Sequence, residues 1–372
     1  MLNILKKVIQ SSPNEQITYE KYMNTVLYHE KKGYYMKNGE KIGRHGDFIT
    51  SSNISTIFGK LFASLFHKLI AIEKIPPFIC EIGGGNGRFA RAVLDELENN
   101  YSDTYQNLTY LIIESSPYHM QLQKEHLPVG KQVVQYQSLD EAKKDFPIFH
   151  GILFSNELFD AFPVRVIEMK ENILHEVKIT LQEDDQITEI LTPLTDGRIF
   201  QYLTTYKIKL VNGQRFEVPL QMLDYLTDLS SFLGNVAVFT VDYGYSKEEW
   251  KEPSKRKGSL RGYYKHQLIE NPLEHPGEMD LTTHIHFDTL ISYGLEQGLE
   301  FVKKMRQDEF LLAAGILAFL QENYDANPFS ENSKRNRAIR SLIMGDGMSS
   351  AFHVVIQQKN IKIKWEQILK NI

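Results

Sequence analysis

The stretch PPFICEIGGGNGRFARAVLDELEN, residues 76–99, decides the fold of this chain. Its first part is a short apolar run that ends in glycines, a pattern typical of a strand buried in a parallel sheet. Its second part, from residue 88 onward, is amphipathic with helical spacing. The stretch therefore predicts a strand, a glycine turn and a helix in direct succession.

The same alternation continues along the chain, as three more apolar runs with amphipathic segments between them. The predicted strands are LTYLIIESS (108–116), KQVVQYQ (131–137) and HGILFSN (150–156), and the predicted helices are SPYHMQLQKEHL (116–127) and DEAKKD (140–145). Strands that alternate with helices imply parallel βαβ units with right-handed crossovers. The sequence thus predicts an α/β fold built on a Rossmann-like sheet.

This alternation is interrupted near Pro163 and resumes at the apolar run NVAVFTVDYG (235–244). Between these points, two strand-like runs and one helical run indicate an insertion folded beside the sheet. The expected division is a helical N-terminal or lid region (1–75), a core (76–162 and 235–372) and an inserted α+β substrate module (163–234).

Composition and charge are ordinary for a globular chain, with 42% hydrophobic and 24% charged residues and a formal net charge of −5. An acidic balance of this kind gives no reason to expect nucleic-acid binding. The run FLLAAGILAFL (310–320) is too short to span a bilayer, so we expect a buried core helix there and no membrane insertion.

Cys80 is the single cysteine, and it lies in an apolar run where it cannot form an internal disulfide. A reducing compartment is the simplest inference from that pattern. The first residues of the chain also lack the uninterrupted apolar core of a signal peptide. A cytoplasmic location is therefore expected.

The glycine turn EIGGGNG (81–87) places Glu81, Gly83, Gly85 and Gly87 at the end of the first strand. Glycines let the backbone turn sharply and approach a ligand, and the helix that follows presents free N–H groups. A dinucleotide fingerprint would require Gly or Ala where Arg88 stands. The spacing instead resembles motif I of class I methyltransferases, whose loop wraps the methionine part of S-adenosylmethionine. The alternative is a turn that only joins strand to helix.

Glu114 ends the second predicted strand, where Rossmann-like sheets place a carboxylate that accepts both ribose hydroxyl protons. The alternative is an ordinary surface glutamate at a strand end. The order of the glycine turn and this carboxylate within one βαβ unit favours a nucleoside ligand. Ser138 and Leu139 follow the third strand at the position that contacts adenine in such folds.

The segment FSNELFDAFPV (154–164) places Asn156, Glu157 and Asp160 at the end of the fourth predicted strand. Strand ends at this edge of an open parallel sheet face the binding crevice. A guanidinium is essentially always protonated, so carboxylates would have to hold its N–H groups, localise its charge, leave one nitrogen nucleophilic and accept its proton. We therefore consider these three residues catalytic candidates. The alternative is that Asn156 or Asp160 caps a helix.

Six segments in order resemble the MidA-type family of proteins, which includes a mitochondrial complex I assembly methyltransferase. They are the opening signature ITYEKYMNTVLYHEKKGYY (17–35) with GDFITSSNISTIFGKL (46–61), then EIGGGNGRFARAVL (81–94), SNELFDAFPV (155–164), VDYG (241–244), GSLRGYYKHQ (258–267) and PGEMDLTTHIHF (276–287). The resemblance implies a class I methyltransferase sheet, mostly parallel with an antiparallel last strand, and an added substrate module. It also implies S-adenosylmethionine as the methyl donor and an arginine-bearing protein as substrate.

Two of these segments carry further candidates. In residues 46–61, Thr50 and Ser51 together with Asp47 offer a polar lid over the cofactor, or caps for the next helix. In the basic stretch 247–265, which continues to His266, Arg261 and His266 could face substrate or cofactor, and the alternative is a solvated loop. The histidines near the end of this region lack a metal-ligand spacing, so no metal is expected.

Three other functions remain open from the sequence. A small-molecule methyltransferase would use the same donor site. A non-catalytic S-adenosylmethionine-binding assembly factor for a respiratory or other complex would use the fold without turnover, and a nicotinamide dehydrogenase would bind NAD instead. A homodimer is compatible with all of these.

Overall fold

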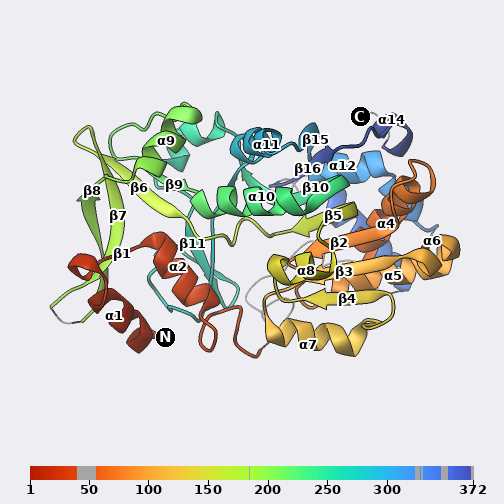
Figure 1. The fold of residues 1–372 in the computed structure, drawn as a ribbon, viewed down its shortest axis with the longest axis horizontal. Coiled ribbons are helices and arrows are strands. Elements are labelled where there is room, and N and C mark those ends of the chain that lie inside the picture. Colours follow the sequence, from red (N-terminus) through yellow and green to blue (C-terminus); the bar gives the residue numbers. More distant parts are fainter. Residues whose placement is uncertain (40–55, 184, 323–326, 328–329, 345–350, 370–372) are drawn as a thin grey trace.

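The structure, a computed structural model, describes residues 1–39, 56–183, 185–322, 327, 330–344 and 351–369. The molecule is elongated, with a large sheet and its helices at one end and a smaller antiparallel sheet at the other (Figure 1). None of the helices in these described ranges has the length and apolar character needed to cross a membrane.

The large sheet has the strand order β15-β16-β10-β5-β2-β3-β4, with β14 paired to β10. Its strands are β2 (Phe78–Ile82), β3 (Thr109–Ile113), β4 (Val133–Tyr136), β5 (Phe149–Asn156), β10 (Leu233–Tyr245), β14 (Ile285–His286), β15 (Glu300–Arg306) and β16 (Phe352–Lys359). β2 runs parallel to β3 and β5, and β5 runs parallel to β10, whereas β16 is antiparallel to both of its neighbours. The predicted mostly parallel sheet with an antiparallel last strand is confirmed.

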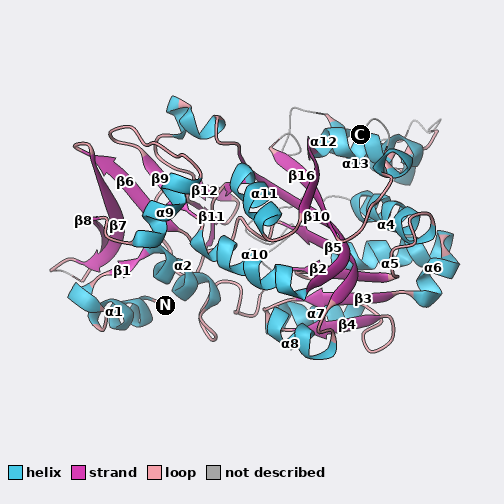
Figure 2. Cartoon of the chain, turned by 45° about the horizontal axis from the view of Figure 1, so that its top comes forward, coloured by secondary structure: helices cyan, strands magenta, loops and turns pink. Residues whose placement is uncertain are grey.

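Helices cover both faces of this sheet (Figure 2). One buried apolar cluster joins the sheet to α4 (Thr56–Ala71), α5 (Arg88–Asn100), α12 (Gln307–Ala314), α13 (Glu331–Ile343) and α14 (Trp365–Ile368). Two clusters on the other face involve α8 (Leu139–Asp145), α10 (Leu220–Phe232) and α11 (Phe287–Glu296). The core is therefore a three-layer α/β/α sandwich, completed by α6 (Ser102–Asn107) and α7 (Pro117–His126).

The smaller sheet is built mainly from the insertion, and it also includes a strand from the N-terminal region. Its members are β1 (Ile17–Thr18), β6 (Arg165–Lys170), β7 (Ile173–Leu181), β8 (Ile187–Pro193) and β9 (Arg215–Val218), and all of the pairings among them are antiparallel. The helices beside it are α1 (Leu2–Gln10), the 3₁₀ turn η1 (Pro13–Glu15), α2 (Tyr19–Tyr28) and α9 (Gly197–Thr205). An apolar cluster that unites α1, α2, β6 and β7 holds the N-terminal region against the insertion.

A third, three-stranded sheet lies within the basic stretch and its continuation. It consists of β11 (Arg261–Tyr264), β12 (Gln267–Ile269) and β13 (Asp280–Thr282), and two 3₁₀ turns, η2 (Glu249–Lys251) and η3 (Pro253–Lys255), precede it. This part of the chain is therefore ordered structure and packs against the apolar cluster of α2 through Met279 and Leu281.

The expectation of one buried helix over residues 310–320 is wrong. Gly315 has φ +96°, a left-handed conformation that ends α12, and a separate 3₁₀ turn η4 (Ile316–Phe319) follows. Phe310, Leu311 and Ile316 are buried, but Leu312, Leu317 and Leu320 are 43%, 51% and 41% exposed. The apolar run therefore covers the sheet with only part of its length.

Phe62 on α4 lies at the centre of a group of packed aromatic rings. It is fully buried, and its ring packs on Phe154 of β5 at 4.9 Å, on Phe239 of β10 at 6.1 Å and on Phe310 of α12 at 5.3 Å between centroids. The side chain therefore ties α4 to two central strands and to a distant helix.

Replacing Phe62 with Ala should lower the free energy of unfolding by about 3–5 kcal/mol, because the buried ring leaves a cavity. Thermal unfolding followed by circular dichroism measures the effect. Phe200→Ala is the matched control, since Phe200 is 43% exposed and should change the midpoint little. Equal shifts for the two variants would contradict this role of α4 in the core.

Candidate active site

A cavity of about 350 Å³ opens at the carboxyl edge of the parallel strands. Its walls come from the loops that follow β2, β3 and β5, and it is closed by side chains of α2 and α10. Residues that the sequence analysis singled out line it from three different loops: Glu81, Gly83 and Gly85, then Glu114, then Asn156 and Glu157. The strand order thus assembles in one cavity groups that lie far apart in the sequence.

The glycine turn requires glycine because its backbone enters the left-handed region. Gly83, Gly85 and Gly87 have φ values of +74°, +50° and +81°. A Cβ added at Gly84 would lie 2.6 Å from Cγ2 of Ile112, so the turn also passes too close to β3 for a side chain. α5 begins at Arg88, directly after the turn, and its N-terminus therefore points at this edge of the sheet.

Glu114 holds this turn in place. Its Oε2 accepts a hydrogen bond from the backbone N–H of Gly85 at 2.8 Å, and its Oε1 accepts one from the N–H of Ser116 at 2.8 Å. The side chain is 7% exposed and lines the cavity. Charge-assisted bonds to two backbone amides fix the carboxylate in one orientation, with its remaining lone pairs available to a ligand.

Glu81 lies at the base of the cavity and is 4% exposed. The hydroxyl of Tyr110 donates to its Oε2 at 2.8 Å. Burial raises the pKa of Glu81 to about 8, although the bond from Tyr110 acts in the opposite direction. This carboxyl is therefore largely protonated at neutral pH unless a cation comes close to it.

Two predicted cofactor positions differ in what their side chains contact. Leu139 lines the cavity together with Gln137. The hydroxyl of Ser138, between them, accepts from the backbone N–H of Glu141 at 3.2 Å and caps α8. Gly87 lies at the N-cap of α5 and is also outside the lining. Thr50, Ser51 and Asp47 lie outside the described residues.

Glu157 has an unusual backbone for a residue other than glycine, with φ +51°. Its N–H donates to the carbonyl of Val241 at 2.9 Å, and its Oε1 accepts from Nδ2 of Asn156 at 3.0 Å. Such a conformation costs of order 1–3 kcal/mol and occurs most often at functional sites. Oδ1 of Asn156 is buried and has no hydrogen-bond partner among the described residues.

Asp160 lies three residues further along the chain. It does not line the cavity, and it is 4% exposed. Its Oδ2 accepts from the hydroxyl of Tyr243 at 2.7 Å, while its Oδ1 has no partner in the described part of the chain. Neither Asp160 nor Asn156 caps a helix, because no helix begins after β5 before α9. The alternative that Asn156 or Asp160 caps a helix is therefore wrong for the helices that the structure describes.

The structure adds Asp242 of β10 to this group of carboxylates. Asp242 is fully buried, and its two oxygens accept from the backbone N–H groups of Phe159 at 3.0 Å and Tyr243 at 2.9 Å. Burial raises the pKa of Asp160, and burial together with Asp160 raises the pKa of Asp242. Burial, followed by Asp160, also raises the pKa of Glu157 well above its ordinary value.

Two tyrosines of the N-terminal region close the cavity on the side away from the sheet. The hydroxyl of Tyr28 donates to the carbonyl of Ala161 at 2.9 Å, and that of Tyr35 donates to Oδ1 of Asp280 at 2.5 Å. Their rings stack at 5.5 Å between centroids. Both residues belong to the segment 17–35 that carried the family resemblance, but their individual roles could not be read from the sequence.

Arg261 and His266 differ in their surroundings. Arg261 packs behind the carboxylates, where its guanidinium contacts His284 at 3.1 Å and helps to keep the pKa of Asp160 from rising further. His266 lies in the exposed turn between β11 and β12. Neither residue lines the cavity. Among the described residues, no group of three or more His, Cys, Asp or Glu side chains could hold a metal ion.

A protein-family model described as "Putative S-adenosyl-L-methionine-dependent methyltransferase" matches residues 59–305, which contain the whole of this cavity's sheet edge. The chain belongs to this family. It is therefore an S-adenosylmethionine-dependent methyltransferase by family, as the glycine turn and Glu114 predicted.

Curated relatives of the chain carry more specific names. One from Drosophila melanogaster, named "Protein arginine methyltransferase NDUFAF7 homolog, mitochondrial", is 27% identical over 76% of this chain and 66% of its own length. One from Danio rerio, named "Protein arginine methyltransferase NDUFAF7, mitochondrial", is 26% identical over 94% of this chain and 84% of its own length. The chain thus spans just under two thirds of the fly protein.

These names contradict the expected cytoplasmic location, because the relatives are mitochondrial proteins. The expectation depended on the absence of a signal-peptide pattern in the first residues and on Cys80, which is buried in β2. A single buried thiol indicates only that no internal disulfide is needed, and it does not distinguish one reducing compartment from another.

Two crystal structures of proteins from Burkholderia thailandensis share the fold. One, bound to S-adenosyl-homocysteine, has a TM-score of 0.87 and 24% identity, and the match covers 97% of this chain and 92% of that one. The other has a TM-score of 0.83 and 23% identity with the same coverage. The similarity extends over the inserted sheet as well as the core.

The residues that line the cavity of this chain fit the methyl donor S-adenosylmethionine. S-adenosylmethionine carries a positive sulfonium, an ammonium and a ribose diol. The cavity offers Glu81 and Glu157 for positive charge, Glu114 for the diol, and a turn in which an added Cβ at Gly83 would already touch Leu158 at 3.3 Å. Among the described residues that line the cavity, carboxylates outnumber cationic side chains, and Arg88 is the one arginine or lysine.

Glu114→Ala should weaken binding of S-adenosylhomocysteine about 100-fold or more, because charge-assisted hydrogen bonds are each worth about 1.5–3 kcal/mol. Isothermal titration measures the dissociation constant. Glu98→Ala, on the exposed face of α5, is the control and should bind as the parent protein does. Unchanged affinity in Glu114→Ala would remove this residue from the donor site.

Binding of S-adenosylhomocysteine should release a proton near neutral pH. The ammonium of the ligand favours the ionised form of Glu81, so its pKa falls from about 8 on binding. Affinity should therefore rise with pH up to about 8 and level off above it. Titrations in buffers of different ionisation enthalpy measure the released proton.

Glu81→Gln is the control for this coupling, because the amide cannot ionise and its affinity should vary little over the same pH range. Tyr110→Phe should leave the pH dependence in place, since it removes only the hydrogen bond to Oε2. Equal pH dependence in the parent protein and Glu81→Gln would show that another group titrates.

Proposed function

We propose that this methyltransferase transfers methyl groups to the guanidinium of an arginine in a protein substrate. The observation that carries the proposal is the pair of acidic side chains beside the donor cavity, Glu157 in its wall and Asp160 behind it, with Oδ1 of Asp160 lacking a partner among the described residues. A cationic, planar group with several N–H donors is the acceptor that best complements such a pair.

The reaction needs both binding and proton removal. When bound, S-adenosylmethionine supplies an electrophilic methyl group: its carbon–sulfur bond breaks as the carbon–nitrogen bond forms, and the electron pair remains on sulfur. Glu157 would accept hydrogen bonds from the guanidinium and thereby leave one nitrogen free to attack. The methylated nitrogen then loses a proton, which Glu157 in the cavity wall would accept.

The raised pKa of Glu157 supports this assignment. Burial and the nearby Asp160 make its ionised form costly when no cation is present. A substrate guanidinium would stabilise the ionised carboxylate, so an arginine should bind in this cavity more tightly than a neutral side chain.

Asp160 and Asp242 would act through electrostatics and positioning. Their hydrogen bonds fix the backbone of residues 159–160 against β10, which in turn holds Glu157 in its left-handed conformation. The N-terminal tyrosines would exclude water from the reacting atoms. The names of the curated relatives, which are protein arginine methyltransferases, support the same acceptor.

The substrate polypeptide would enter between the insertion, residues 163–234, and the N-terminal region. These two parts meet through β1 and β7 and flank the cavity through Asn24 of α2 and Gln221 of α10. A homodimer stays a prediction.

Glu157→Gln should lower methyl transfer at least about 100-fold while binding of S-adenosylhomocysteine stays within about twofold. The assay follows the radiolabelled methyl group of S-adenosylmethionine into extract proteins, and acid hydrolysis then identifies the labelled amino acid. Label in methylarginine that is lost in Glu157→Gln supports the proposal.

Glu189→Gln is a matched control, because Glu189 is a glutamate of the inserted sheet that pairs with Arg215 outside the cavity. Label recovered in a small molecule or in another amino acid would contradict the arginine assignment. A protein that binds the donor but transfers no label to any fraction would instead support the non-catalytic assembly role.

A further inference from the structure

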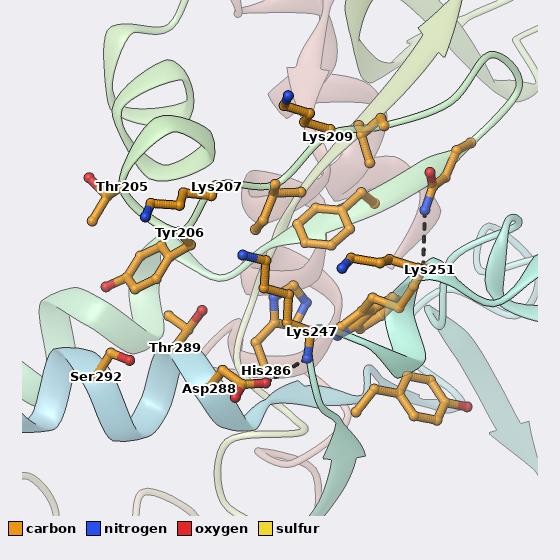
Figure 3. Close-up of a pocket in the computed structure, with 16 residues that line it drawn as sticks. Thr205, Tyr206, Lys207, Lys209, Lys247, Lys251, His286, Asp288, Thr289 and Ser292 are labelled. Carbon is orange, nitrogen blue, oxygen red and sulfur yellow. Dashed lines mark hydrogen bonds between the residues drawn. The ribbon is translucent and has the colours of Figure 1, made fainter.

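A second cavity, of about 240 Å³, lies between the insertion and the core and shares no lining residue with the donor cavity. Three parts of the chain line it: residues 205–216 after α9, residues 245–251 at the end of β10 and in η2, and residues 286–292 at the start of α11 (Figure 3). Nothing in the proposed methyl transfer uses these residues.

Aromatic rings form the inner wall of this second cavity. The ring of Trp250 packs against Phe216 at 5.3 Å, against His286 at 4.7 Å and against Tyr245 at 5.1 Å between centroids. Ile208 and Leu210 complete the apolar surface. Flat rings and aliphatic side chains around a small volume favour a ligand with a planar, apolar body.

The polar part of the lining is strongly cationic. Four lysines contribute to it, whereas Asp288 is its one carboxylate among the described residues, and Oδ2 of Asp288 accepts the backbone N–H of Lys247 at 2.5 Å. The lysines come from two sides, Lys207 and Lys209 from the loop after α9 and Lys247 and Lys251 from the segment after β10 that includes η2 (Figure 3).

Of these lysines, only Lys251 has an ion pair in the described structure, with Glu248 at 2.6 Å. Lys207, Lys209 and Lys247 form no ion pair there, although Lys247 lies near enough to Glu248 to help lower the pKa of that carboxyl. This gathering of positive charge occurs in a chain whose formal net charge is −5, so the cavity differs in sign from the protein as a whole.

Two buried polar atoms of the wall also lack partners in the described structure. They are Nε2 of His286 and Nε1 of Trp250, in side chains that are 4% and 5% exposed. His286 is held in place through its Nδ1, which lies 2.8 Å from the hydroxyl of Tyr202, and burial lowers its pKa to about 3. A buried group without a partner costs about 1–3 kcal/mol, which a bound polar ligand recovers.

We propose that this cavity is a binding site for a small organic anion with a single planar ring system and a carboxylate or phosphate. The aromatic wall would hold the ring, and Lys207, Lys209 and Lys247 would hold the anionic group at the mouth. The volume suits a free small molecule rather than a polypeptide segment. The site is independent of the donor cavity and of the proposed arginine acceptor.

The test uses 2-naphthoate as the probe and the full chain saturated with S-adenosylhomocysteine, so that the donor cavity is occupied. Trp250 lies in the proposed site and Trp365 lies in the core beside Phe239, so quenching of the indole fluorescence reports on binding. Trp250→Phe should abolish the quenching, and equilibrium dialysis measures binding independently of fluorescence.

The expected result is saturable binding of 2-naphthoate that weakens about tenfold or more in the double variant Lys207→Ala, Lys247→Ala and weakens with added salt. The neutral 2-naphthamide should bind the parent protein about tenfold more weakly than the acid. Lys131→Ala, at an exposed turn remote from the lining, is the charge-matched control and should not change binding.

Absence of saturable binding would overturn the proposal, and so would affinity that does not respond to the two lysine replacements. Displacement of 2-naphthoate by S-adenosylhomocysteine would also overturn it, because the probe would then occupy the donor cavity. None of these outcomes depends on whether arginine is the methyl acceptor, so the two proposals can fail separately.

Discussion

The carboxylate of Glu114 is the interaction on which the active site depends. By accepting from the N–H groups of Gly85 and Ser116, it joins the loop after β2 to the loop after β3. Gln123 of α7 supports the same turn by donating to the carbonyl of Gly85 at 2.6 Å. The glycine turn can therefore remain in its left-handed conformation without side chains of its own, and its bare backbone is available to a ligand.

The second constraint is electrostatic. Glu81, Glu157, Asp160 and Asp242 are carboxyl groups that burial has made harder to ionise. Buried carboxylates without cations usually reduce stability, so their retention at one edge of the sheet calls for a functional reason. In the function we propose, a sulfonium donor and a guanidinium acceptor would both stabilise the ionised forms, and the site would then select for cations.

Much of the fold could be predicted because its signals are local. The glycine turn, the alternation of strands and helices and the interruption near Pro163 each lie within short stretches of sequence. Strand ends of a parallel sheet share one edge, so the convergence of Glu114 and Glu157 on one cavity followed from the strand assignments alone. The prediction of one helix over residues 310–320 was wrong because Gly315 ends α12. Helix propensity over the whole run did not indicate this end.

The parts that could not be predicted depend on pairing between distant residues. Asp242 joins the carboxylates only because β10 pairs with β5 in a register that sets Val241 beside Asn156. Tyr35 and Asp280 meet although 245 residues separate them in the sequence, and β1 pairs with β7 of the insertion. The sequence placed Ser138 directly after the third predicted strand, but it did not indicate that the Ser138 hydroxyl caps α8.

A crystal structure of the protein with S-adenosylhomocysteine tests the central claim most directly. We expect electron density in the cavity at the ends of β2, β3 and β5, with both ribose hydroxyls hydrogen-bonded to Glu114 and the homocysteine part along residues 83–85. The sulfur should face Glu157. Ligand density at any other place, or a ribose turned away from Glu114, would contradict the account.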